Sequence, residues 1–312
     1  MSGRKRLGVV GVGALGFHHA RILSQMPSVE MIGVHDARAE RLAEVGAQLG
    51  VGMFTDMREL ASKCDAVVVA VPTTYHEPVA TAMLEEGAHV LIEKPIAPDL
   101  ASADRILFAA RQAGKLVQIG HVERFNPILR AAERYIQDPL FIESNRLAPF
   151  GIRPTDVAVV LDLMIHHLDL VLSLMPGTVS WFSAVGVPVL ADSPDIANAR
   201  IEFENGAVAD LTSSRVSMKK MRDMRFFQRS GYIRLDLAAG TGEFLRLRDG
   251  ARAKLGEKLG DTTNLLEIIE RVPLEGDGAE PLRSELESFV AAVEGRAAIA
   301  VSGEDGRRAL AV

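Results

Sequence analysis

The sequence is poor in cysteine and in long apolar runs, and both shortages exclude classes of protein. Its 312 residues include a single cysteine, Cys64, so no internal disulfide framework can form and a reducing compartment is favoured. No stretch approaches the roughly 20 apolar residues that a membrane-spanning helix needs. The basic segment 1–6 precedes a glycine-broken apolar run without a cleavage pattern, so we expect no signal peptide. These features predict a soluble, cytoplasmic protein without membrane insertion.

An excess of positive charge is also absent. The formal net charge at pH 7 is −6, so no general positive field attracts nucleic acid or an anionic membrane. The chain length and the 48% share of hydrophobic residues are sufficient for a large core and favour two domains. We therefore expect a two-domain globular protein with no nucleic-acid partner.

Strand and helix patterns alternate along the first 120 residues. Strands are predicted at residues 7–12, 29–35, 65–71, 89–92 and 116–119, and helices from the end of the first strand to 25 and at 39–49, 78–86 and 100–113. Segment 65–71 is almost continuously apolar, as expected of a strand that is buried on both faces. The alternation predicts an α/β fold with a doubly wound parallel sheet. We assign residues 1–120 to a first domain with this fold.

The pattern changes after residue 120. Helices are predicted at 126–135, 155–174 and 281–293, a strand at 140–147, and strands with turns over 179–247, whereas 250–278 is expected to contain loop. Asn205-Gly206 lies between two strand patterns and is a strong hairpin signal. Residues 121–312 are therefore expected to form an α+β domain with a largely antiparallel sheet.

A glycine-rich loop follows the first predicted strand and precedes a helix. Gly11, Gly13 and Gly16 have the spacing of a dinucleotide-binding loop. Gly11 permits the tight turn, Gly13 lets the backbone approach a pyrophosphate, and Gly16 allows close helix–strand packing. The helix amino end would face the phosphates. We expect Ala14 and Leu15 to contact the cofactor too; the alternative is that the glycines serve only a turn.

Asp36 and Arg38 bear on which dinucleotide is bound. Asp36 ends the second strand, twenty residues beyond Gly16, where it would accept hydrogen bonds from the adenosine ribose hydroxyls. A carboxylate there repels a 2′-phosphate, so the sequence favours NAD over NADP. Arg38 is close enough to weaken that preference.

Two further segments follow predicted strands at the same edge of the sheet. Lys94 comes directly after the strand at 89–92 and is fixed by Pro95, which places an ammonium where open α/β sheets bind ligands. The loop after the strand at 65–71 carries Thr73 and His76, which we expect to contact the cofactor. Taken alone, His76 fits equally well as a residue near solvent at a helix amino end.

A carboxylate and an imidazole lie four residues apart in the predicted helix at 155–174. Asp162 and His166 therefore share a helix face, among apolar neighbours. Such a pair can orient the imidazole and raise its basicity, as a general base requires. A structural hydrogen bond is one alternative. A metal site is another, but no cysteine cluster completes it, and we expect no metal.

These motifs carry a family resemblance that covers nearly the whole chain. The sequence resembles the glucose–fructose oxidoreductase/inositol dehydrogenase (Gfo/Idh/MocA) family in the glycine loop, in Pro72-Thr73 with His76, in Glu93-Lys94-Pro95 and in the Asp162…His166 pair. The resemblance implies a Rossmann domain and a second domain, here 121–312, whose open sheet carries substrate and subunit contacts. A homodimer or homotetramer is expected. Glu93 and His121 join the expected cofactor contacts, and Lys94, Asp162 and His166 are the expected catalytic residues.

A narrower similarity concerns the substrate. Segments 120–127, 162–169 and 224–228 resemble the branch described as UDP-N-acetylglucosamine 3-dehydrogenases of lipid A 3-amino-sugar synthesis. That branch oxidises the C3 hydroxyl to a ketone, and a separate aminotransferase then acts. His167 departs from the aspartate expected there, which bears on substrate identity. The expected substrate contacts are Lys94, Arg124, Asn126, Arg153, His166 and His167.

The mechanism implied by these residues divides hydride and proton transfer. His166, oriented by Asp162, takes the hydroxyl proton while hydride passes to the nicotinamide, and Lys94 binds the substrate oxygen or relays the proton. A lysine pKa of about 10.4 makes Lys94 a poor base at neutral pH, whereas histidine titrates near 6.5. Arg124 is the best candidate for the diphosphate; the basic segment 215–229 is a second candidate, although a solvated loop explains it more simply.

Three alternatives to this function stay open. The chain could be a dehydrogenase of inositol or another sugar, a non-catalytic NAD-binding regulator, or a nucleotide-sugar-binding module without redox chemistry.

Overall fold

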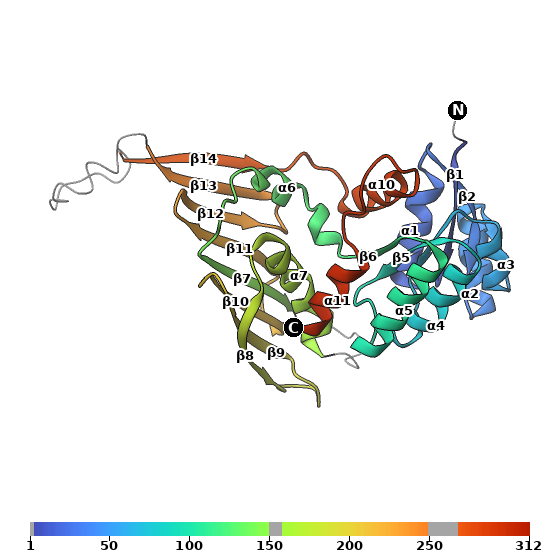
Figure 1. Cartoon of the computed structure of the whole chain (residues 1–312), viewed down its shortest axis with the longest axis horizontal. Helices are drawn as coiled ribbons and strands as arrows, with labels where there is room; N and C mark the ends of the chain where they lie inside the picture. Colours follow the sequence, from blue (N-terminus) through green and yellow to red (C-terminus); the bar gives the residue numbers. More distant parts are fainter. Residues whose placement is uncertain (1–2, 150–157, 249–267) are drawn as a thin grey trace. The chain divides into compact units, whose positions relative to one another are not determined.

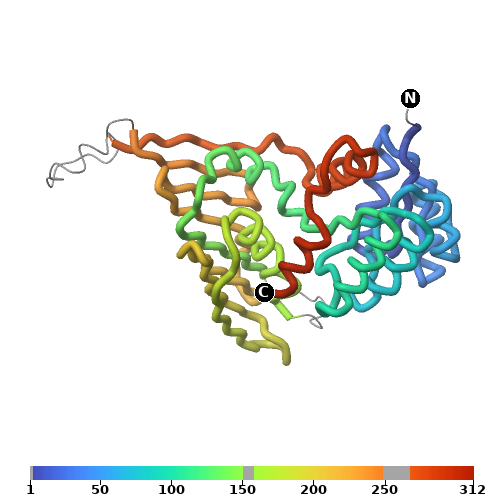
Figure 2. Tube along the Cα trace, in the orientation of Figure 1, coloured from blue at the N-terminus to red at the C-terminus, as the bar shows by residue number. Residues whose placement is uncertain are grey.

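A computed structural model of the chain describes residues 3–149, 158–248 and 268–312, in two compact units. Unit 1 comprises Met1–Val122 and Pro281–Val312, and unit 2 comprises Glu123–Glu280. Figures 1 and 2 colour both units along the chain, so the two separate segments of unit 1 can be followed as blue-to-green and red. Among the described residues, no helix is long and apolar enough to cross a membrane.

Unit 1 is built on a six-stranded parallel sheet, which confirms the predicted doubly wound fold. The strand order is β3-β2-β1-β4-β5-β6. The strands are β1 (Lys5–Val10), β2 (Val29–His35), β3 (Gly52–Met53), β4 (Ala66–Val69), β5 (His89–Glu93) and β6 (Val117–Gly120). The helices are α1 (Ala14–Ser24), α2 (Ala39–Leu49), α3 (Met57–Ser62), α4 (His76–Glu85), α5 (Leu100–Ala113), α10 (Pro281–Val293) and α11 (Gly303–Ala311), with a 3₁₀ turn η1 (Thr73–Tyr75).

Helix α10 packs with unit 1, although the expected division places residues 281–312 in the second domain. Its apolar face contributes Leu286, Phe289 and Val290 to a buried cluster with residues of α1, β1, β2, β4 and β5. Figure 2 shows red α10 beside blue α1. The amphipathic pattern identified the helix correctly, but it carries no information on which sheet the apolar face covers.

Unit 2 contains an eight-stranded sheet of order β14-β13-β12-β11-β7-β10-β9-β8. Only β7 and β10 pair in parallel, so the predicted largely antiparallel sheet is confirmed. The strands are β7 (Phe141–Pro149), β8 (Val179–Val187), β9 (Ile196–Phe203), β10 (Val208–Ser217), β11 (Met221–Gln228), β12 (Gly231–Asp236), β13 (Thr241–Leu247) and β14 (Ile269–Glu275). The hairpin predicted at Asn205-Gly206 joins β9 to β10, with Gly206 at a φ of 81°.

Helices cover one face of the unit 2 sheet. They are α6 (Pro127–Glu133), η3 (Val160–Met164), which is a π-helix, and α7 (Ile165–Leu174). Ile142, Leu211 and Phe226 point toward them and are fully buried. The start of the helix predicted at 155–174 lies outside the described residues. Much of the loop predicted at 250–278 does too, but its described end is strand β14, which the polar composition concealed.

The opposite face of this sheet, which we call the open face, carries alternating charged and apolar side chains. Register places Glu143, Arg225 and Arg234 side by side across β7, β11 and β12. Trp181 on β8 and Phe227 on β11 are 52% and 40% exposed. Large apolar side chains left to solvent in this way commonly mark a surface that contacts another molecule.

Candidate active site

The glycine loop between β1 and α1 is shaped to accept a ligand. Gly11 has a φ of 86°, in the left-handed region that favours glycine. A Cβ on Gly16 would lie 1.8 Å from the carbonyl oxygen of Gly11, so a side chain there would separate α1 from the loop. By contrast, a Cβ on Gly13 would meet no described atom within 4 Å. Ala14 and Leu15, the first residues of α1, are exposed beside this open space, which fits the pyrophosphate of a dinucleotide.

Asp36 joins the end of β2 to the glycine loop. Its carboxylate accepts hydrogen bonds from the Val12 amide (3.0 Å) and from the amide (2.9 Å) and Nε (3.2 Å) of Arg38. Burial alone would raise the pKa of Asp36, but these hydrogen bonds hold it below its usual value. Asp36 is therefore charged at neutral pH. Arg41, which the sequence motifs do not reveal, donates from Nε to the carbonyl oxygen of Val12 at 2.7 Å and braces the same loop.

The loop after β4 is held by His76. The His76 ring is buried, with Nδ1 2.9 Å from the carbonyl oxygen of Pro95 and Nε2 2.9 Å from that of Val71. Burial lowers the pKa of His76. Each ring nitrogen faces a backbone carbonyl oxygen, and the neutral ring donates to one of the two. The ring thus connects the loop to the Glu93-Lys94-Pro95 segment. Pro72 is exposed and Thr73 half-buried at the surface of this loop.

Lys94 follows β5 and is half-buried, directly after a buried residue, Glu93, that is hydrogen-bonded to a histidine. The Glu93 carboxylate lies 2.7 Å from Nε2 of His19, a fully buried residue of α1. Burial opposes ionisation of Glu93, but His19 and Lys94 outweigh it and hold the Glu93 pKa below its usual value. The pair couples helix α1 to strand β5, which ends directly before Lys94. His121, just after β6, is buried in the same unit.

A second buried carboxyl lies on the same face of the sheet. Glu285 of α10 is fully buried, and Gln118 of β6 donates from Nε2 to its carbonyl oxygen at 3.5 Å. Among the described residues, neither carboxyl oxygen of Glu285 has a hydrogen-bond partner. Burial, and then the charge of Glu93, raise the pKa of Glu285 well above its ordinary value. The surroundings of Glu285 therefore favour its protonated form, whereas those of Glu93 favour the charged form.

The predicted Asp–His pair belongs to unit 2. Asp162 lies in the π-helix η3 and is exposed, whereas His166 lies in the first turn of α7 and is 9% exposed. Short π-helical segments inside helices occur frequently at functional sites. Lys94 and His121 belong to unit 1.

His167 is a core residue. Its Nδ1 lies 2.5 Å from Oγ of Ser144 on β7, and the ring is 1% exposed. Burial, reinforced by the positive charge of Arg146, lowers the pKa of His167 to about 3. The ring is therefore neutral at physiological pH and packs helix α7 onto the sheet.

Charged residues that follow β6 are fixed by partners far away in the sequence. Arg124 donates from Nε (2.7 Å) and Nη2 (2.6 Å) to the carboxylate of Asp169 on α7, a bidentate pair that the sequence did not reveal. Asn126 caps α6 through the Ile128 amide and donates to the carbonyl oxygen of Leu237. Asp169 thus orients the Arg124 guanidinium, and Asn126 stabilises the start of α6.

Opposite charges also pair elsewhere in unit 2, and the pair formed by Glu123 and Arg146 is buried. Glu123 accepts hydrogen bonds from Arg146 (2.7 Å) and Arg222 (3.2 Å). Arg215 binds Asp195 at 2.7 Å, and Arg225 binds Glu143 at 3.2 Å. Three arginines of the basic segment 215–229 are therefore bound by three separate carboxylates. Arg153 lies outside the described residues, and within the described ranges no three potential metal ligands cluster.

Comparison with known proteins agrees with this geometry. Residues 5–121 match the family model "Oxidoreductase family, NAD-binding Rossmann fold", and residues 144–234 match the GFO/IDH/MocA C-terminal domain. The chain is 34% identical to the UDP-N-acetylglucosamine 3-dehydrogenase of Acidithiobacillus ferrooxidans, covering 98% of this chain and 94% of that protein. A solved structure of that enzyme superposes with a TM-score of 0.88, at 33% identity and the same coverage. A myo-inositol 2-dehydrogenase of Thermotoga maritima is 27% identical, over 98% of this chain and 93% of that protein.

Proposed function

Because the chain belongs to the Gfo/Idh/MocA family of NAD-binding oxidoreductases, we propose that it oxidises the C3 hydroxyl of a nucleotide sugar, UDP-N-acetylglucosamine, to a ketone. The observation that carries this substrate is the 34% identity, over 98% of the chain, to an enzyme of that activity. The ionised Asp36 beside the glycine loop supports NAD rather than NADP, because it would repel a 2′-phosphate.

Each proposed role rests on a described side chain. NAD, when bound, supplies the hydride acceptor, and the glycine loop with Asp36 holds it. His166 takes the hydroxyl proton, with Asp162 in the preceding turn as its orienting partner. Lys94, fixed behind the buried His19–Glu93 pair, binds the substrate oxygen and stabilises its developing negative charge. Arg124, oriented by Asp169, binds the diphosphate. A 3-keto sugar is the kind of product that an aminotransferase consumes.

A substrate panel tests this proposal directly. The protein with NAD should increase absorbance at 340 nm with UDP-N-acetylglucosamine and much less with myo-inositol, which has neither diphosphate nor uridine. The product should be two hydrogens lighter than the substrate, with oxidation at C3 by NMR. A preference for myo-inositol would reject the nucleotide sugar but keep the dehydrogenase. Tight NAD binding without turnover of any substrate would instead favour a regulator.

We also propose that the open face of the unit 2 sheet joins two copies of the chain. The exposed Trp181 and Phe227 on this face support a contact that excludes water from apolar surface. A Trp181→Glu/Phe227→Glu variant should therefore have half the mass of the wild-type particle, or less, in light scattering after gel filtration. Glu30→Gln, an exposed change in unit 1, serves as the control. A monomeric wild-type protein, or an unchanged mass in the variant, would contradict this assembly.

A further inference from the structure

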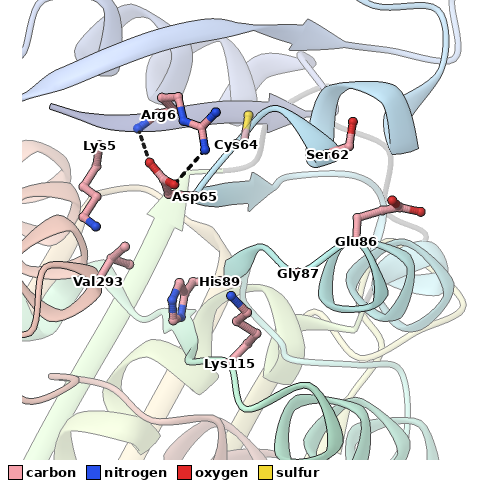
Figure 3. Close-up of a pocket in the computed structure, with 10 residues that line it drawn as sticks. All are labelled: Lys5, Arg6, Ser62, Cys64, Asp65, Glu86, Gly87, His89, Lys115 and Val293. Atoms are coloured by element: carbon pink, nitrogen blue, oxygen red, sulfur yellow. Dashed lines mark hydrogen bonds and ion pairs between the residues drawn. The ribbon is translucent and has the colours of Figure 1, made fainter. Parts of the chain in front are cut away.

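A cavity of about 380 Å³ opens at the amino-terminal edge of the unit 1 sheet. Lys5 and His89 begin β1 and β5, and Lys115 precedes β6, so residues from three strand starts line it (Figure 3). The glycine loop and Lys94 follow the opposite, carboxyl-terminal ends of β1 and β5. The cavity is therefore separate from the proposed NAD site.

The carboxylates that line this cavity are already matched by arginines. Both oxygens of Asp65 accept hydrogen bonds from Arg6, one from the backbone amide at 2.9 Å and one from Nη2 at 3.0 Å. Glu86 binds Arg58 at 2.8 Å. Each carboxylate on the lining thus has an arginine partner, although Arg58 also binds Glu85.

Lys5 and Lys115 are left as surplus positive charge. Both are half-buried, and within residues 3–149, 158–248 and 268–312 neither forms an ion pair or side-chain hydrogen bond. Figure 3 shows them on either side of the His89 ring. Lysines are rarely buried without a partner. The charge of Lys5 acts on Asp65, but that carboxylate already binds Arg6, so the cavity keeps a surplus of positive charge.

The His89 ring adds a directed donor. Its Nδ1 accepts a hydrogen bond from the Leu116 amide at 2.9 Å, so the proton of the neutral ring lies on Nε2. Burial, followed by the charges of Lys115 and Lys5, lowers the pKa of His89, while Asp65 acts weakly in the opposite sense. An anion bound beside the two lysines would offset their positive charge and so raise the pKa of His89.

We propose that this cavity is a binding site for a small phosphate-bearing ligand, held by Lys5, His89 and Lys115. Two ammonium groups and one imidazole N–H match the several acceptor oxygens and double charge of a phosphate. The volume lies within the range of small-molecule sites, about 300–1,000 Å³, and accommodates a phosphate with a small organic group. The polar lining favours a hydrophilic ligand over an apolar one.

Calorimetric titration of the full chain with inorganic phosphate tests the site, with saturating NAD present to fill the cofactor loop. The wild-type protein should bind phosphate, and a Lys5→Gln/Lys115→Gln variant should bind it at least about tenfold more weakly, because each charge-assisted contact contributes strongly. Arg134→Gln/Arg248→Gln, which removes two exposed cations of unit 2 outside the segment 215–229, should bind like wild type. Titration with ribose 5-phosphate distinguishes the two possible ligands. If it binds more tightly than inorganic phosphate, the ligand is an organic phosphate ester; if the two bind equally, the ligand is free phosphate.

A second measurement does not depend on variants. Phosphate should raise the pKa of His89, followed by NMR of its ring protons, whereas sodium chloride at equal ionic strength should not. Absence of binding heat, equal affinity in the Lys5/Lys115 variant, or a His89 pKa that responds equally to both salts would each overturn the proposal.

Discussion

Substituting asparagine for His166 should lower kcat by roughly 10²- to 10⁴-fold, the usual contribution of a positioned general base, while NAD affinity stays nearly unchanged. Asparagine keeps hydrogen-bonding capacity at this buried position in α7 but cannot accept the hydroxyl proton. The wild-type enzyme should lose kcat/KM as the pH falls and His166 becomes protonated. That acidic limb should be absent in the variant. Steady-state kinetics from pH 5 to 9, with NAD binding measured separately, provide the comparison.

The neighbouring histidine supplies a matched control for this experiment. His167 packs against Ser144 and is held neutral by burial, so His167→Asn should mainly lower the thermal unfolding midpoint. Its remaining activity should keep the wild-type dependence on pH. Wild-type turnover in His166→Asn would reject the base assignment and transfer the proton to the alternative acceptor, Lys94.

Substituting glutamine for Glu285 should stabilise the protein increasingly as the pH rises. The folded-state pKa of Glu285 lies well above the unfolded value of about 4.5, because the side chain is buried beside charged Glu93. Folding therefore retains a proton that the unfolded chain releases. Between pH 4.5 and the folded-state pKa, the stability of the wild-type protein therefore falls as the pH rises. In that interval the equilibrium constant for folding decreases by up to about tenfold per pH unit. Glutamine has no proton to retain, so its advantage should grow over that interval.

Thermal unfolding of both proteins at pH 5, 6, 7 and 8 measures this difference. Glu287→Gln is the control, since Glu287 lies on the exposed side of α10, 3.6 Å from Arg283, and its effect should vary little with pH. A constant offset between wild type and Glu285→Gln at every pH would show that the carboxyl is charged in the folded state.

Local patterns predicted much of the fold. The spacing of Gly11, Gly13 and Gly16 constrains a turn whose geometry depends on adjacent residues, and Asn205-Gly206 determines its own hairpin in the same way. Strand β5 and the position of Lys94 followed from a short apolar run. By contrast, β3 (Gly52–Met53) has only two residues, which is too short to show an alternation. Strand β14 was hidden by polar side chains because most of its residues are not buried.

Contacts between distant residues could not be predicted from one sequence. His19 and Glu93 are 74 positions apart, and Arg124 and Asp169 are 45 apart. Nothing in the local composition indicates which carboxylate meets which cation, because that choice depends on how helices pack onto their sheets. The same reason explains why His167 looked like a substrate contact in the sequence but packs inside unit 2, and why α10 was placed in the second domain.

The discontinuity of unit 1 has a consequence for biosynthesis. Leu286, Phe289 and Val290 complete a core whose other members come from the first 91 residues, yet all of unit 2 is synthesised between them. A nascent chain that stops before α10 leaves apolar surface of α1 uncovered. The amino-terminal domain should thus reach its final stability only after the ribosome has translated α10, and until then the growing chain presents a surface that chaperones can bind.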